Sequence, residues 1–391
     1  DILGDRATQD AVHQEIAAIL ERHPDEARQA KLLFGKALLA DRRSDAALSE
    51  RLACQCMDLA QRCGAAQWAA MAHGQLAWLH IARQDYVGAA RHVEAGLAWA
   101  GRMENPLGRA ETEAQLLTLS GIVSMVQLHL AQARGTLEAV LSRGELLGKP
   151  RLQLGAMYNL AQVAGNLARW GDVAAWGERM RALASAIGVR ADVAAGQLRL
   201  AEAAAALGDT GAAMRWHAQN LVIQRAIGGR RDEAIALRFL GELQLEQGDL
   251  HTALQSCTQG LAIHTTLQEP LEACLLAAAA ALCKVRLGEP AEARAGLNAT
   301  LDRLHSDLAE YLAHETIDLR WRCHQALAAL HDERAGPLLD QLHADVLATA
   351  AARTDADDRD RLIQAMPNFR AIAAAHPTVC APVVQPTVPR Q

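Results

Sequence analysis

Small residues next to leucines recur along this chain with a period of about 40 residues. Leu160–Ala161, Leu200–Ala201 and Leu240–Gly241 are clear instances, and a second small or β-branched residue follows about twelve positions after each. Apolar residues three and four positions apart around both points indicate amphipathic helices. Each period therefore predicts two helices that touch at the small residues. The first positions are Gly35, Ala77, Gly121, Ala161, Ala201, Gly241, Ala281 and Cys323, and the second are Ala47, Ala89, Ala133, Val173, Ala213, Ala253, Ala293 and Ala335.

Turn residues separate the two predicted helices of a period. In Gly248–Asp249 the glycine can end one helix in the left-handed conformation, and the aspartate can cap the start of the next. Gly208–Asp209 repeats this arrangement, and Pro290 after Gly288 suits the first turn of a helix, which needs no backbone donor. These turns predict antiparallel helical hairpins without strands.

The combination of a small residue in the first helix, a Gly-Asp turn and an alanine in the second helix resembles the tetratricopeptide repeat. The usual unit of that family has 34 residues, so the units here are lengthened. The resemblance implies an all-α, right-handed superhelical solenoid of about eight hairpins. We expect residues 1–27 to form an N-terminal capping helix or linker, 28–348 the repeat array, 349–375 a C-terminal capping helix and 376–391 a Pro-rich disordered tail.

Lengthened units of this kind look like the C-terminal sensor regions of bacterial signalling ATPases, which include MalT-type activators and multidomain nucleotide cyclases. The segment from Arg359 to Ile372 is similar to the pattern that closes such sensor arrays, with departures at Ile363 and Phe369. The first residue is Asp1 and not Met, so we expect the chain to be part of a longer protein.

Composition narrows the classes of function. Hydrophobic residues make up 51% of the chain and aromatic residues only 3%, so alanine and leucine carry the apolar content and favour helices. A net charge of −6 without a basic cluster disfavours direct binding of nucleic acid or of a membrane surface. The eight cysteines are irregularly spaced and lie mostly in predicted helices, which is typical of reduced thiols in a cytoplasmic protein.

Two motifs could suggest a catalytic or a metal site, but neither has the spacing that such a site requires. The segment from Gly144 to Pro150 is similar to a phosphate-binding loop, but its spacing is short and no strand precedes it. Cys54, Cys56 and Cys63 with His73 could suggest zinc, but residues two apart on a helix point to different sides. We therefore expect no enzyme activity, cofactor or metal in this segment.

Binding residues follow from the resemblance, because the first helices of tetratricopeptide units line the inner, concave face. Positions counted from the small residues give an apolar stretch, then a hydrogen-bonding stretch, then a charged stretch. The candidate ligand-binding residues are Trp78, Met125, Tyr158, Gln162, Asn166, Glu202, Arg238, Glu242, Arg286, Arg320 and His324.

Our main hypothesis is a non-catalytic sensor domain of a larger bacterial signalling or transcription-regulatory protein. Its groove would bind a peptide, a protein or a small effector. One alternative is a free-standing scaffold or peptide receptor. Another is the repeat region of a nucleotide cyclase or ATPase whose catalytic domain lies outside this chain. The sequence leaves the ligand and the oligomeric state open.

Overall fold

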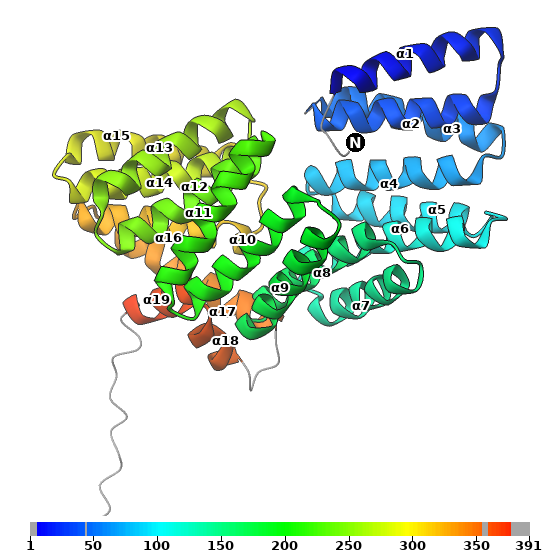
Figure 1. The fold of residues 1–391 in the computed structure, drawn as a ribbon. Helices are drawn as coiled ribbons and strands as arrows, with labels where there is room; N and C mark the ends of the chain where they lie inside the picture. The colour runs from blue at the N-terminus through cyan, green and yellow to red at the C-terminus, as the bar shows by residue number, and fades with distance from the viewer. Residues whose placement is uncertain (1–5, 44, 354–358, 377–391) are drawn as a thin grey trace, which may run out of the picture. The chain divides into compact units, whose positions relative to one another are not determined.

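The fold is all-α. The computed structural model describes residues 6–43, 45–353 and 359–376, and within these ranges it contains α-helices and one short 3₁₀ turn but no strand. Figure 1 shows the helices stacked as antiparallel pairs. The expected tail falls outside these ranges from residue 377 onwards. The predicted class, a tetratricopeptide-like solenoid of helical hairpins, is confirmed.

Each 40-residue period forms one hairpin. The first helices are α2 (Glu26–Arg42), α4 (Ala66–Ala82), α6 (Pro106–Val126), α8 (Pro150–Asn166), α10 (Arg190–Ala206), α12 (Arg230–Glu246), α14 (Pro270–Arg286) and α16 (Ile317–Ala329). The second helices are α3 (Ala46–Arg62), α5 (Tyr86–Ala100), α7 (Leu130–Leu146), α9 (Trp170–Ala186), α11 (Thr210–Ile227), α13 (Leu250–Thr266), α15 (Pro290–His305) and α17 (Ala335–Arg353).

Three further helices flank the hairpins in the described part of the chain. α1 (Arg6–Arg22) packs on α2, and its His13 lies where a side chain on Gly35 would be, 2.9 Å from the position of a Cβ atom. Beyond α17 the chain forms α18 (Arg359–Ala365) and α19 (Pro367–Ala375), which pack on each other and on α17. Leu362 and Ile372 are buried there. The two short helices thus cover the last hairpin with apolar residues.

The turns between helices recur every 20 residues, so there are two turns in each 40-residue period. Residues with positive φ stand at Gly208, Gly228, Gly248, Gln268 and Gly288. Gly248 has φ 82° and is followed by Asp249, whose side chain accepts a hydrogen bond from the Thr252 amide and caps α13. The period therefore consists of two nearly equal helices, each joined to the next by a short turn.

The small residues pack as predicted in most hairpins. A Cβ atom on Gly121 would stand 2.8 Å from the Leu137 side chain, and one on Gly241 would stand 2.8 Å from the sulfur of Cys257. Ala77, Ala161 and Ala201 are completely buried. Gly35 differs, because it faces α1 instead of its own hairpin partner. The close approach of the helices explains why no larger side chain occupies these positions.

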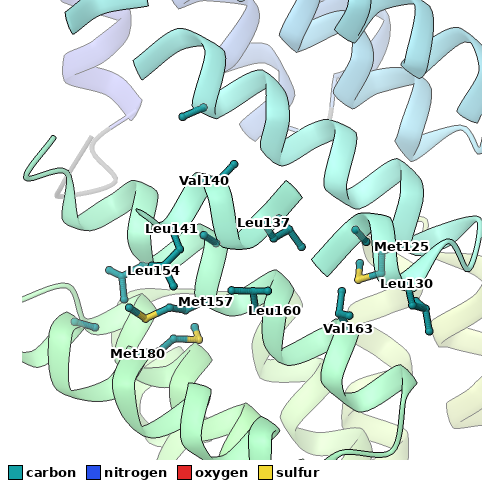
Figure 2. Packing of buried hydrophobic residues seen from close by; sticks show 14 residues of the cluster. Met125, Leu130, Leu137, Val140, Leu141, Leu154, Met157, Leu160, Val163 and Met180 are labelled. Carbon is teal, nitrogen blue, oxygen red and sulfur yellow. The ribbon is translucent and has the colours of Figure 1, made fainter. Parts of the chain in front are cut away.

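The chain divides into two compact units, unit 1 up to Ala203 and unit 2 from Ala204. Each has its own apolar core. In unit 1 a cluster from α6 to α9 includes Leu137, Leu160 and Met180 (Figure 2). In unit 2 a cluster around α14 and α16 includes Leu282 and Leu319.

Candidate functional site

Within each unit the first helices form an inner layer. In unit 1, α2, α4, α6 and α8 contact one another in succession, and in unit 2 α12, α14 and α16 do the same. The second helices of successive hairpins are further apart, so the layer of first helices lies on the more tightly packed side of each stack. The candidate residues are described on these two layers separately.

The apolar candidates of unit 1 lie in different environments. Trp78 on α4 is 42% exposed, which makes it available to a ligand. Met125 on α6 is only 8% exposed and points into the packed cluster with Leu130 and Val163 (Figure 2). Trp78 is therefore exposed enough to contact a ligand, whereas Met125 is a residue of the apolar core.

The hydrogen-bonding candidates of unit 1 lie half-buried on α8. The Asn166 amide donates to the Gln162 carbonyl at 3.2 Å, a bond within one helix that leaves the Asn166 side-chain oxygen as an acceptor. The Gln162 carboxamide has no hydrogen bond among the residues that the structure describes. It therefore offers a donor and an acceptor, the pair that an extended peptide backbone requires.

A buried arginine joins α8 to α10. Arg199 is 8% exposed, and its guanidinium carbon lies 4.7 Å above the centre of the Tyr158 ring. One of its nitrogens donates to the Tyr158 hydroxyl at 3.4 Å, and another pairs with Glu202 at 2.8 Å. The Nε atom has no acceptor. Tyr158 and Glu202 were predicted, but Arg199 was not, because it lies two residues before Ala201 and outside the positions counted as inner.

Unit 2 carries a buried ionic network on its first helices. Arg238 on α12 pairs with Glu242 at 3.1 Å, and Glu242 also accepts a hydrogen bond from Arg322 of α16 at 3.4 Å. The Nε atom of Arg238 lies 3.2 Å from Glu272 of α14, at ion-pair distance but without the alignment of a hydrogen bond. Arg322 also reaches Glu246 at 3.6 Å.

The network stabilises its own charges. Burial would lower the pKa of Arg238, but the carboxylates of Glu272 and Glu242 raise it above the usual arginine value. Burial would raise the pKa of Glu242, but Arg322 and Arg238 more than offset this, so its pKa is lowered. Both groups therefore remain charged at neutral pH, with each partner compensating the other.

The remaining candidate residues of unit 2 form hydrogen bonds or ion pairs with other residues of the chain. Arg286 donates to the Leu245 carbonyl at 3.3 Å. His324 stacks on Trp321 and bonds the Ala335 carbonyl at 3.0 Å. Arg320 pairs with Asp345 of α17 at 2.5 Å. His324 and Arg320 thus contact groups toward α17, whereas Arg322 is the residue of α16 that reaches the network.

Three histidines that the sequence did not single out as a group meet in unit 1. The Nδ1 atoms of His73 on α4 and His92 on α5 lie 3.0 Å apart, and the His80 ring is tilted against the His92 ring with 5.0 Å between the ring centres. His80 bonds Asp85 at 2.8 Å. Burial and the neighbouring His92 lower the pKa of His73 to about 4, so the pair is held neutral.

The described residues were also compared with the requirements of a metal site and of a membrane span. In the described ranges, no three His, Cys, Asp or Glu side chains are arranged to hold a metal ion. Cys56 is buried and donates to the Ala30 carbonyl, and burial raises the pKa of its thiol to about 12. None of the described helices combines the length and hydropathy that a membrane crossing requires.

Comparison with known proteins gives the fold. No protein-family model and no curated protein matches the sequence. A Rap protein complexed with competence and sporulation factor is similar with a TM-score of 0.56 and 10% identity, over 89% of this chain and 99% of that chain. NprR in complex with its cognate peptide NprX gives a TM-score of 0.52 and 13% identity, over 88% of this chain and 98% of that chain.

A third similar structure comes from a different class of protein. It is a signal transduction ATPase with numerous domains from Pyrococcus horikoshii, which has a tetratricopeptide repeat sensor. The TM-score is 0.56 at 10% identity, over 86% of this chain and 52% of that chain. These similarities, with the helical hairpins described above, show that the chain has a tetratricopeptide-like helical-repeat fold.

Proposed function

We propose that this chain is a peptide-binding regulatory domain, with the peptide lying on the inner layer of unit 1. The observation that carries the proposal is that Gln162 on α8 and Arg199 on α10 both have unsatisfied hydrogen-bonding groups, while Tyr158 of α8 contacts Arg199. Gln162 offers an unpartnered carboxamide, and Arg199 is a buried cation with one unpartnered N–H. An extended peptide can bond the carboxamide through its backbone and place a carboxylate near the arginine.

The apolar part of the site supports the same ligand. Trp78 displays an indole ring on the same inner layer, and Tyr158 presents a half-buried ring. Aromatic anchors with a few convergent polar groups are typical of peptide sites. One of the similar structures is complexed with competence and sporulation factor and another with its cognate peptide NprX, which favours a peptide here.

The experiment is a screen of synthetic peptides of five to ten residues by fluorescence polarisation against the whole chain. Gln162→Ala and Tyr158→Ala should each weaken the best peptide at least about fivefold, because each removes a direct contact. Gln132→Ala, an exposed amide on the second helix α7, is the matched control and should bind normally. Equal binding by all three variants, with unchanged melting temperatures, would refute the site.

We further propose that the domain senses its ligand for a larger bacterial signalling protein. A peptide that bridges several first helices changes how the repeats stack, and this change can pass to a neighbouring domain. The gene sequence upstream of Asp1 tests this idea. An ATPase or cyclase domain in frame supports it, whereas a start codon directly upstream favours the free-standing receptor.

A further inference from the structure

The helical repeat of unit 2 is interrupted between α15 and α16. Most helices are joined by short turns such as residues 247–249, but here residues 306–316 form a longer connection with a 3₁₀ turn at Ala313–Glu315. The connection is part of the core. Leu308 is 2% exposed and belongs to the same apolar cluster as Leu304 and Tyr311. The break is therefore an ordered insertion.

A cavity of about 560 Å³ lies against this connection. It is bounded by α15, α16 and α17, and its volume falls within the range of small-molecule sites. The apolar part of its wall consists of Leu301, Leu304, Leu308, Leu327, Pro337 and Leu338. All the residues that line it belong to unit 2, and none of them is part of the proposed peptide site.

A buried ion pair forms the polar part of the wall. Arg320 is 6% exposed, pairs with Asp345 at 2.5 Å and donates to the Ala313 carbonyl at 2.9 Å. Its Nε atom is buried and has no acceptor among the residues that the structure describes. An unpartnered N–H of a buried guanidinium is costly, and an anionic group of a ligand would satisfy it.

The lining also supplies a negative group. Asp302 lines the cavity, and in the described part of the chain its carboxylate makes no hydrogen bond or ion pair. Arg334, which lines the cavity too, is already paired with Asp332 at 2.8 Å. Among the described residues, the wall thus has one N–H without an acceptor, on Arg320, and one carboxylate without a bonded cation, on Asp302. A zwitterion carries a carboxylate and an ammonium group and can satisfy both.

We propose that this cavity binds a small zwitterion with an apolar side chain, its carboxylate on Arg320 and its ammonium group on Asp302 or Asp345. Free apolar α-amino acids and short apolar peptides share this chemistry. The site would give unit 2 a small-molecule input of its own. It rests on different residues from the proposed peptide site, so either can fail without the other.

Isothermal titration calorimetry of the whole chain tests the proposal with L-leucine, L-phenylalanine, L-methionine and L-leucyl-L-leucine. At least one should bind. The blocked analogues of the best amino acid, its N-acetyl derivative and its amide, should each bind about tenfold more weakly or worse, because each removes one charge. Tighter binding of the dipeptide identifies a peptide source, and tighter binding of a free amino acid identifies an amino-acid source.

A substitution that fills the cavity with a large side chain tests whether the ligand binds there. Ala309 is exposed at the edge of the cavity, so Ala309→Trp should block binding without removing a core side chain. Ala344→Trp, on an exposed position of α17 outside the cavity, should leave binding intact. Circular dichroism verifies that both variants fold, and the blocked analogues test the proposal independently of either. No binding by any zwitterion at millimolar concentration, equal binding of the blocked analogues, or full binding by a folded Ala309→Trp would each overturn it.

Discussion

The two units hold their buried arginines in different ways. In unit 1, Arg199 rests on the Tyr158 ring and has a single carboxylate partner, Glu202. In unit 2, Arg238 and Arg322 share a network of carboxylates that spans three helices. The same fold therefore carries one lightly held cation and one extensively compensated pair.

This difference indicates which unit binds a ligand on its inner layer. A ligand carboxylate at unit 2 has to displace a carboxylate that already compensates the arginines, so the exchange brings little net gain. Among the described residues, the Nε atoms of Arg199 and Arg238 both lack a hydrogen bond, but that of Arg238 already lies 3.2 Å from the Glu272 carboxylate. A ligand at Arg199 therefore adds a bond without displacing such a carboxylate. We therefore expect the network of unit 2 to serve stability and the Arg199 site to serve binding.

The largest expected effect comes from breaking the network. Arg322→Met removes the cation that reaches both Glu242 and Glu246 and leaves a buried carboxylate short of compensation. We expect unit 2 to lose about 3 kcal/mol of unfolding free energy. Urea denaturation, with hydrogen exchange resolved by peptide, assigns the loss to unit 2.

Arg199→Met in unit 1 is the matched comparison. Its guanidinium has one carboxylate partner, which is itself partly exposed, so we expect a loss of only about 1 kcal/mol. If both substitutions cost the same, the contrast between a compensated network and a lightly held cation does not exist.

Acid should destabilise both units, each through a buried histidine. In unit 2, burial and the neighbouring Arg353 lower the pKa of His314 to about 4. The His73 pKa is lowered from 6.5 to about 4 in the folded chain. As the pH falls from 6.5 toward 4, the unfolded chain takes up a proton that the folded chain does not, so unit 1 loses about 2–3 kcal/mol. The lowered pKa of Glu242 acts in a lower window, because its contribution is lost only below the usual pKa of a glutamate.

Urea unfolding at pH 7 and pH 5 measures this sensitivity. His73→Gln should remove much of the acid loss of unit 1, whereas His129→Gln, an exposed control on the same unit, should leave it unchanged. An acid loss that is the same in His73→Gln and in the original chain would assign the sensitivity to other groups.

The sequence predicted the hairpins because their contacts are local. Gly121 and Leu137 lie in one hairpin, and so do Gly241 and Cys257, so the small residue and its neighbour recur at a fixed spacing. The ionic network did not follow from that spacing. Whether Arg322 or Arg320 faces Glu242 depends on how α16 is rotated after the long connection at 306–316, and no periodic signal encodes that rotation.

The candidate binding residues show the same limit. Counting from the small residues found Tyr158 and Gln162, which lie on the inner layer with open surface, but it treated Met125 in the same way although that side chain joins the core. Counting positions from the small residue predicts the direction in which a side chain leaves its own helix. It does not predict whether a neighbouring helix covers that side chain. Arg199 lies outside the counted positions, and its contact with Tyr158 of another helix leaves no signal at that spacing.

The smallest expected effect tests what holds Arg199. The guanidinium lies over the Tyr158 ring, and the hydrogen bond to the hydroxyl is long at 3.4 Å. Tyr158→Phe keeps the ring and should cost less than about 0.5 kcal/mol, whereas Tyr158→Leu should cost about 1 kcal/mol because the cation–π contact is lost. Urea denaturation of the three chains measures the order. If phenylalanine costs as much as leucine, the hydroxyl and not the ring face holds the cation. Unit 1 would then hold its arginine through polar acceptors, as unit 2 does, and the preference for unit 1 as the ligand site would have to rest on Gln162 and Trp78 alone.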